Sequence, residues 1–163
     1  MAIVHLGIGS NLGNRQENCR EAVRQLGLRG MKVVKQSSMI ETEPWGVTEQ
    51  PCFINMAVEA ETDLVPDRLF AMLKDIEAAM GRTDAVRWGP RIIDLDILFY
   101  DDLILDTADL IIPHPHLHER DFVLIPLAEI APEKTHPRLN KTVQELKIAV
   151  SLKSHSDEGP RMR

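Results

Sequence analysis

The sequence has few cysteines, few aromatic residues and no long hydrophobic run. Its two cysteines, Cys19 and Cys52, form no CxxC pair, which argues against a disulfide framework and favours a reducing compartment. No apolar segment approaches the roughly 18 residues that a membrane-spanning helix needs. The first six residues lack the basic start and long apolar stretch of a signal peptide. We therefore expect a cytoplasmic protein with no membrane partner.

The sequence also has fewer basic than acidic residues. The chain has 19 Lys and Arg against 25 Asp and Glu, a net charge of −6. A broad nucleic-acid surface needs a basic face, so we expect no nucleic-acid partner and small-molecule substrates instead. The length of 163 residues suits one domain, which we place at residues 1–150. The polar segment 151–163 is predicted to be a disordered tail, and the protein is expected to be a monomer.

The spacing of apolar residues predicts alternating strands and helices. Strands are expected at 3–9, 32–42, 53–62, around the acidic pair Asp94 and Asp96, and at 110–112. Helices are expected at about 15–26, from 66 to the residue before Gly81, at 122–130 despite Pro126, and at 143–150. The leading order is β-α-β-β-α-β, the split βαβ arrangement. The predicted fold class is α+β, with a ferredoxin-like βαββαβ core and an antiparallel-rich sheet on which helices pack.

The most informative segment, 87–99, ends in an Asp-x-Asp pair inside an apolar run. Strand side chains alternate between faces, so Asp94 and Asp96 point the same way. The opposite face is expected to carry Leu95, Ile97 and Phe99. Two neighbouring carboxylates repel each other, and Mg²⁺ relieves that repulsion while binding substrate phosphates. Arg87 and Arg91 lie just upstream, where guanidinium groups can bind the same phosphates. The segment predicts a metal–phosphate site.

The same segment resembles the signature of the hydroxymethyl-dihydropterin pyrophosphokinases of folate synthesis. The matching residues are Arg87-Trp88-Gly89-Pro90-Arg91-x-x-Asp94-Leu95-Asp96-Ile97. Further motifs follow in the family's order: Gly7-Ile8-Gly9-Ser10-Asn11-Leu12-Gly13, Thr42-x-Pro44-x-Gly46, Gln50-Pro51-x-Phe53-x-Asn55, Glu77-x-x-x-Gly81-Arg82, Pro113-His114, Arg120-x-Phe122 and Pro126-Leu127-x-Glu129-Ile130-Ala131-Pro132. The resemblance covers about residues 2–150. It implies a ferredoxin-like fold and a reaction in which the pterin hydroxymethyl oxygen attacks the β-phosphorus of ATP. The pyrophosphoryl group moves intact, AMP leaves, and two Mg²⁺ ions are used.

The resemblance also implies a role for each matched residue. Asp94 and Asp96 are the expected metal ligands, and with Arg82 and Arg91 they form the expected catalytic set. The pterin is expected to contact Thr42, Glu43, Trp45, Phe53, Asn55, Asp94 and Phe122. The two phenylalanines would stack on the flat ring, and the Asn55 amide offers both a donor and an acceptor. ATP is expected to contact Lys74, Glu77, Arg82, Trp88, Arg91, Ile97, Leu110, His114 and Arg120.

Three other interpretations of the site remain open from the sequence. A two-metal nucleotidyl- or phosphotransferase acting on another alcohol would use the acidic pair but not Phe53, Asn55 and Phe122. A ligand-sensing ferredoxin-like module would have no need of the acidic pair beside arginines. The His-x-His-x-His series at 114–118 superficially resembles a zinc site, but Pro115 interrupts a regular strand there.

Overall fold

The computed structural model describes residues 1–42, 52–81 and 92–156. Its elements are β1 (Ala2–Ser10), α1 (Arg15–Leu28), β2 (Lys32–Gln36), β3 (Ile40–Thr42), β4 (Phe53–Thr62), α2 (Pro66–Ala79), β5 (Asp94–Tyr100), β6 (Leu105–Asp106), β7 (Ile111–Ile112), the 3₁₀ helix η1 (Leu117–Glu119), α3 (Asp121–Ile130) and α4 (Val143–Ser156). The main sheet has the strand order β2-β4-β1-β5, with β3 also paired to β4, and its pairings are antiparallel. The predicted α+β class and antiparallel-rich sheet are confirmed.

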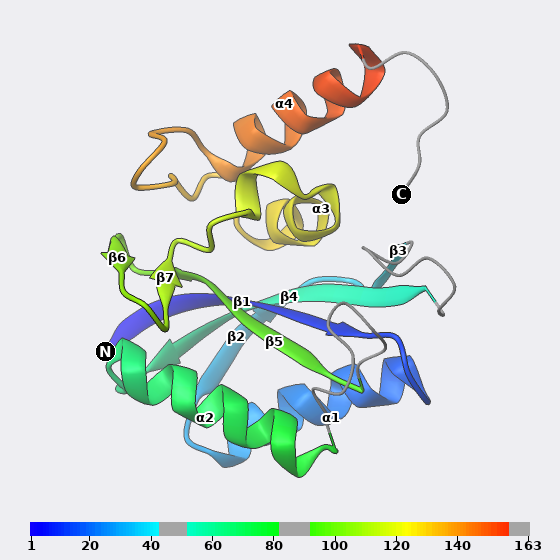
Figure 1. Cartoon of the computed structure of the whole chain (residues 1–163), viewed down its shortest axis with the longest axis vertical. Coiled ribbons are helices and arrows are strands. Elements are labelled where there is room, and N and C mark those ends of the chain that lie inside the picture. The colour runs from blue at the N-terminus through cyan, green and yellow to red at the C-terminus, as the bar shows by residue number, and fades with distance from the viewer. Residues whose placement is uncertain (43–51, 82–91, 157–163) are drawn as a thin grey trace.

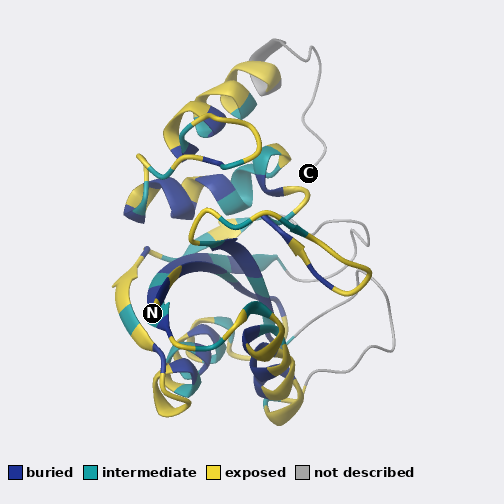
Figure 2. Ribbon diagram, turned by 90° about the vertical axis from the view of Figure 1, so that its left-hand side faces the viewer, coloured by how far each residue is buried: buried dark blue, intermediate teal, exposed yellow. Residues whose placement is uncertain are grey.

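Helices cover both faces of this sheet (Figure 1). α1 and α2 pack on one face, and α3 and α4 lie on the other. Figure 2 shows the buried residues of α1 and α2 on the sides that face the sheet. One core cluster joins these two helices to side chains such as Val4, Leu6 and Ile8 of β1. A second cluster joins α3 and α4 to Ala57 and Leu98. Strands β4 and β5 therefore contribute side chains to both cores, whereas the buried apolar residues of β1 belong to the first.

The single strand predicted at 32–42 is wrong, because β2 and β3 are separate strands. Both pair with β4, but the register shifts between them. Ser37 lies at the break, where its backbone N–H donates to the carbonyl of Ala57 at 2.9 Å. The Ser37 hydroxyl in turn accepts from the Ala57 N–H at 2.9 Å. A side-chain oxygen thus takes the place of a backbone carbonyl, a competition typical of serine, and the ladder is interrupted.

The predicted side-chain orientation in β5 is confirmed for Asp94 and Asp96 but is wrong for Phe99. Leu95 and Ile97 pack with the α1–α2 core, as alternation requires. Phe99 instead packs with Leu98 in the α3–α4 core. The cause is a register shift between His5 and Leu6 of β1, where β5 contains one extra residue. Such a bulge reverses the alternation beyond it.

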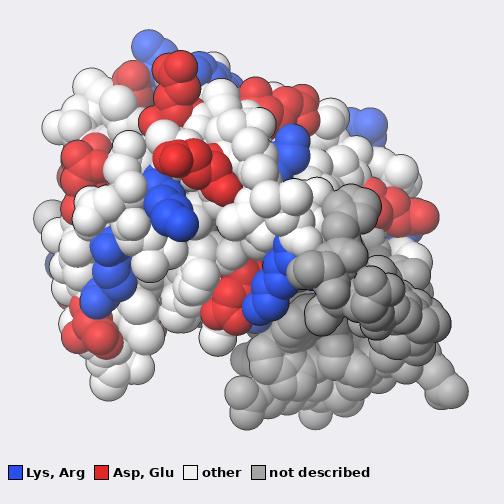
Figure 3. Space-filling model, turned by 90° about the horizontal axis from the view of Figure 1, so that it is seen from above, with Lys and Arg blue, Asp and Glu red and all other residues white. Residues whose placement is uncertain are grey.

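The later helices match the predicted positions with one difference in length. α3 runs through Pro126, as predicted. α4 continues to Ser156, so the helix extends past residue 150 into the segment predicted to be a disordered tail. None of the helices in the described part of the chain has the length and apolar character needed to cross a membrane. Seen from the α4 side, basic and acidic side chains are interspersed over the surface (Figure 3).

Candidate functional site

The register of three adjacent strands places the Asn55 side-chain amide near the carboxylates of Asp94 and Asp96. Gly9 of β1 pairs with Asn55 of β4 on one side and with Asp94 of β5 on the other. Gly7, two residues earlier on the same face, pairs with Asp96. Asn55 and both carboxylates therefore belong to one surface of the sheet, the surface that α3 partly covers.

Glycine leaves this part of the sheet open. A Cβ at position 9 would lie 2.9 Å from Asn55 Oδ1, which is closer than real side chains approach. A Cβ at position 7 would meet the Leu98 side chain at 3.5 Å, an ordinary contact. Gly9 is thus required by the close approach of the Asn55 amide. Neither glycine is among the site residues predicted from the sequence, although a Gly-x-Gly pattern within a strand is a signal of close approach.

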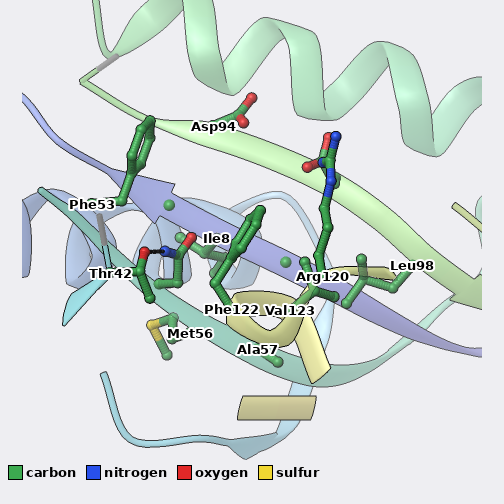
Figure 4. Close-up of a pocket in the computed structure, with 14 residues that line it drawn as sticks. Ile8, Thr42, Phe53, Met56, Ala57, Asp94, Leu98, Arg120, Phe122 and Val123 are labelled. Atoms are coloured by element: carbon green, nitrogen blue, oxygen red, sulfur yellow. Dashed lines mark hydrogen bonds between the residues drawn. The ribbon is translucent and has the colours of Figure 1, made fainter. Parts of the chain in front are cut away.

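A pocket opens over these glycines, with walls from β4, β5 and the start of α3 (Figure 4). It brings together seven of the predicted site residues, namely Thr42, Phe53, Asn55, Asp94, Asp96, Arg120 and Phe122. Phe53 comes from β4 and Phe122 from the first turn of α3, and both rings line the opening. The Arg120 guanidinium lies 5.6 Å from the centre of the Phe122 ring. The pocket therefore combines two aromatic rings with a charged end.

Negative charge is concentrated at that end. Burial, followed by the neighbouring carboxylates of Asp94 and Glu77, raises the pKa of Asp96 to about 8. Arg120 and Lys74 act in the opposite direction. Burial also lowers the pKa of the Arg120 guanidinium, against the carboxylates of Asp96 and Asp94. The cationic side chains thus offset only part of the carboxylate repulsion, and the site has the electrostatics of a cation-binding site.

A second pocket lies on the other side of Asp96, towards α2 and β7. It is lined by four of the residues predicted to contact ATP, Lys74, Ile97, Leu110 and His114, together with Asp96 itself. Burial, and then the neighbouring Arg120 and His116 side chains, lower the pKa of His114 to about 4, so the His114 imidazole is neutral at pH 7. The two pockets meet at one carboxylate. Ligands bound in both would therefore come together at Asp96.

Glu77 occupies a different position from these residues. Its side chain is buried in the last turns of α2 and lies outside the linings of both pockets. Glu77 Oε2 accepts the backbone N–H of Leu95 at 2.8 Å, and Oε1 lies 3.3 Å from Lys74 Nζ. The carboxylate thus contacts the backbone between the two aspartates.

Five of the predicted site residues lie outside the described part of the chain, namely Glu43, Trp45, Arg82, Trp88 and Arg91. Within residues 1–42, 52–81 and 92–156, no group of three or more His, Cys, Asp or Glu side chains is arranged to hold a metal ion. The histidine series at 114–118 therefore provides no zinc cluster there. The acidic pair supplies two carboxylates, which is the number that Mg²⁺ commonly takes from a protein when substrate phosphates supply the rest.

Comparison with known sequences identifies relatives over most of the chain. A family model described as 7,8-dihydro-6-hydroxymethylpterin-pyrophosphokinase matches residues 5–132. A 2-amino-4-hydroxy-6-hydroxymethyldihydropteridine pyrophosphokinase of Aquifex aeolicus is 40% identical over 153 residues, covering 94% of this chain and 95% of the relative. The protein of the same name from Bacillus subtilis is 47% identical over 129 residues, covering 78% of this chain and 77% of the relative.

Solved structures share the fold. The HPPK-DHPS of Plasmodium falciparum with SDX-DHP aligns with a TM-score of 0.74 and 18% identity, covering 96% of this chain and 45% of that one. The chain thus spans less than half of that structure. It likewise covers 23% of an Arabidopsis thaliana folate synthesis bifunctional protein that is 49% identical over 127 residues. These likenesses confirm the ferredoxin-like architecture.

Proposed function

The chain belongs to the 7,8-dihydro-6-hydroxymethylpterin-pyrophosphokinase family, and from this premise we propose that the pocket over Gly7 and Gly9 binds the pterin beside a magnesium–ATP site at Asp94 and Asp96. The chain is a pyrophosphokinase of folate synthesis, with ATP as its co-substrate. A bond forms between the pterin hydroxymethyl oxygen and the β-phosphorus of ATP. The bond from that phosphorus to the oxygen bridging the α-phosphorus breaks, and AMP leaves.

The observation that supports the site assignment is that one pocket combines aromatic rings with polar and acidic side chains. Phe53 and Phe122 offer aromatic faces, and Asn55 offers a polar amide beside them. A flat heteroaromatic ring with donors and acceptors on its edge needs this combination. Asp94 and Asp96 lie at the other end of the pocket. A hydroxymethyl arm on the ring would point to the carboxylates.

The residues present fit Mg²⁺. Asp94 and Asp96 lie on one face of a strand, and burial, followed by the neighbouring carboxylates of Asp94 and Glu77, raises the pKa of Asp96. A bound divalent cation removes this repulsion and neutralises charge on the phosphates during transfer. We assign two Mg²⁺ ions to Asp94 and Asp96, because negative charge on the ATP phosphate oxygens must be neutralised on both sides of the β-phosphorus. Both aspartates are the proposed ligands.

The second pocket is assigned to the nucleotide. Ile97 and Leu110 supply apolar walls for the adenine ring, and Lys74 and His114 lie where they can contact ribose or phosphate oxygens. Arg120 borders the acidic pair, which suits a contact with the triphosphate. Because the two pockets meet at Asp96, the acceptor oxygen and the β-phosphorus would be brought close together. Positioning of this kind supplies much of the catalysis in phosphoryl transfer.

Further roles complete the proposal for residues outside the described part of the chain. Arg82 and Arg91 are assigned to charge stabilisation in the transition state, and Trp88 to the nucleotide. Glu43 and Trp45 are assigned to the pterin. Each assignment is supported by the matching family motif. We also propose that residues 1–150 form one catalytic domain that acts as a monomer.

Product analysis by ³¹P NMR tests the substrates and the reaction. The protein is incubated with ATP, Mg²⁺ and hydroxymethyl-dihydropterin, and we expect AMP and a pterin diphosphate. ADP with a pterin monophosphate would retain the Mg–ATP site but contradict pyrophosphoryl transfer. Absence of pterin-dependent ATP consumption would favour another acceptor or a sensing role.

The metal assignment is tested by Asp96→Ala, with Asp106→Asn as the matched control. Asp106 is an exposed carboxylate on β6 and does not itself line either pocket. We expect Asp96→Ala to fold and to lose turnover by about 10³-fold, as when a major electrostatic contact to the transition state is removed. The control should retain both activity and its Mg²⁺ dependence. Near-normal, chelator-sensitive activity in Asp96→Ala would show that the metal ligands lie elsewhere.

A further inference from the structure

Glu77 is a buried carboxylate in a position where an apolar residue would satisfy the packing of α2. It is only 2% exposed, and its helical neighbours Leu73 and Ile76 are buried apolar side chains. Burying a carboxylate is costly unless hydrogen bonds compensate. The Glu77 carboxylate accepts hydrogen bonds from the backbone N–H of Leu95 at 2.8 Å and from Lys74 Nζ at 3.3 Å. The choice of a carboxylate therefore indicates a role connected to Leu95.

Leu95 lies between the two proposed metal ligands, on the last strand of the sheet. β5 is the terminal strand in the order β2-β4-β1-β5 within the described residues. Leu95 pairs in register with Ile8, while Asp94 and Asp96 pair with Gly9 and Gly7. An amide on the outer edge of a terminal strand has no strand partner. Glu77 supplies an acceptor for that amide from α2.

We propose that Glu77 is a positioning residue that orients the carboxylates of Asp94 and Asp96 by holding the backbone N–H of Leu95 between them. The bonded N–H belongs to the peptide unit that joins Asp94 to Leu95, and Asp96 is the next residue, so a shift of this backbone would displace both aspartates. β1 pairs with β5 along one edge, and the Glu77 bond holds the Leu95 amide at the other edge. This inference rests on the proposed role of the aspartates as Mg²⁺ ligands. Groups that orient metal ligands typically change metal affinity or activity by about 10–100-fold when they are removed.

The test compares Glu77→Gln, Glu77→Leu and the control Asp75→Asn. Glutamine retains an oxygen acceptor for the Leu95 amide, and leucine removes it while keeping a similar volume. Asp75 is an exposed acid on the same helix, so its variant matches the loss of charge without the hydrogen bond. Two quantities are measured besides turnover. One is hydrogen exchange of the Leu95 amide in metal-free protein, and the other is the affinity for Mg²⁺ with a non-hydrolysable ATP analogue, measured by calorimetry.

We expect the Leu95 amide to exchange slowly in the wild type, the glutamine variant and the control, and rapidly in Glu77→Leu. Mg²⁺ affinity should fall by about 10–100-fold in Glu77→Leu only, with kcat falling and the KM for pterin unchanged. If Glu77→Gln keeps a protected Leu95 amide but loses as much Mg²⁺ affinity as the leucine variant, the proposal is overturned. Unchanged Mg²⁺ affinity in Glu77→Leu would also overturn it.

If the leucine variant does not fold, the glutamine variant decides, because its Leu95 amide and Mg²⁺ affinity should both match the wild type. A failure of the underlying metal assignment is recognised separately, since Asp96→Ala would then bind Mg²⁺ as the wild type does. In that case the Leu95 exchange data would describe a purely structural bond, and the positioning role would be rejected.

Discussion

The side-chain amide of Asn55 donates a hydrogen bond of 2.7 Å to the Thr42 hydroxyl. This bond fixes the orientation of the amide, with Nδ2 towards β3 and Oδ1 over Gly9, where a Cβ would be only 2.9 Å away. Asn55 therefore presents an acceptor of defined direction in the pocket. A ring edge that carries an N–H donor is the natural partner of such an acceptor.

Thr42→Val should weaken pterin binding by releasing the Asn55 amide. Loss of one hydrogen bond of this kind costs about 1 kcal/mol, which corresponds to about a fivefold higher KM for pterin. The KM for ATP should not change, because Thr42 does not line the second pocket. Thr42→Ser keeps the hydroxyl and should behave like the wild type. Steady-state kinetics with each substrate varied in turn checks this, and equal effects of valine and serine would contradict the positioning of Asn55.

Gly9→Ala and Gly7→Ala form a matched pair that tests the floor of the pocket. The methyl group at position 9 would collide with Asn55 Oδ1, whereas the one at position 7 would make an ordinary contact with Leu98. We expect Gly9→Ala to raise the KM for pterin by about tenfold, the equivalent of about 1.4 kcal/mol. Gly7→Ala should have a smaller effect. Calorimetric titration with pterin distinguishes them, and the reverse order would show that Asn55 is free to move aside.

Phe122→Ala should affect pterin far more than ATP. The Phe122 ring lines the first pocket and is absent from the lining of the second. An aromatic pair contributes about 0.5–1.5 kcal/mol beyond its buried area, so the Kd for pterin should rise by about tenfold or more. Phe122→Tyr keeps the ring and serves as the control. Equal losses for the two ligands, measured by titration, would count against stacking.

Acid should destabilise the protein through His114. Its folded-state pKa is lowered to about 4 by burial, against an unfolded value of 6.5. Between these values the unfolded chain binds one proton more, so the free energy of unfolding falls as the pH drops through that window. The slope contributed is at most about 1.4 kcal/mol per pH unit. Protonation at Nδ1 would also remove the acceptor for the His116 N–H, at 3.2 Å.

Urea denaturation across this pH window checks the contribution. His114→Gln should reduce the slope of unfolding free energy against pH, whereas the exposed neighbour variant His116→Gln should change it much less, because His116 is the smallest contributor to the lowered pKa of His114. An unchanged slope in His114→Gln would mean that the histidine gains its proton in the folded state as readily as in the unfolded chain. Stability well above pH 6.5 should be unaffected by the titration itself, because His114 is then neutral in both states.

Local features of this protein were determined by its sequence alone. The period-two alternation placed Asp94 and Asp96 on one face of a strand, and the 3.6-residue period placed the helices that flank the sheet. Ordered motifs indicated the family, and through it the aromatic pair Phe53 and Phe122. These predictions depended on the geometry of single elements and on matches along the chain. Neither requires knowledge of which elements meet.

Only the tertiary structure decided the features that depend on contacts between distant segments. The reversed facing of Phe99 arises from a bulge against β1, and the break between β2 and β3 arises from Ser37 bonding to β4. The burial of Glu77 against Leu95 and the bond from Asn55 to Thr42 likewise join separate elements. Periodicity describes one element at a time, whereas hydrogen bonds between elements depend on register and packing, which are set when the sheet and helices assemble.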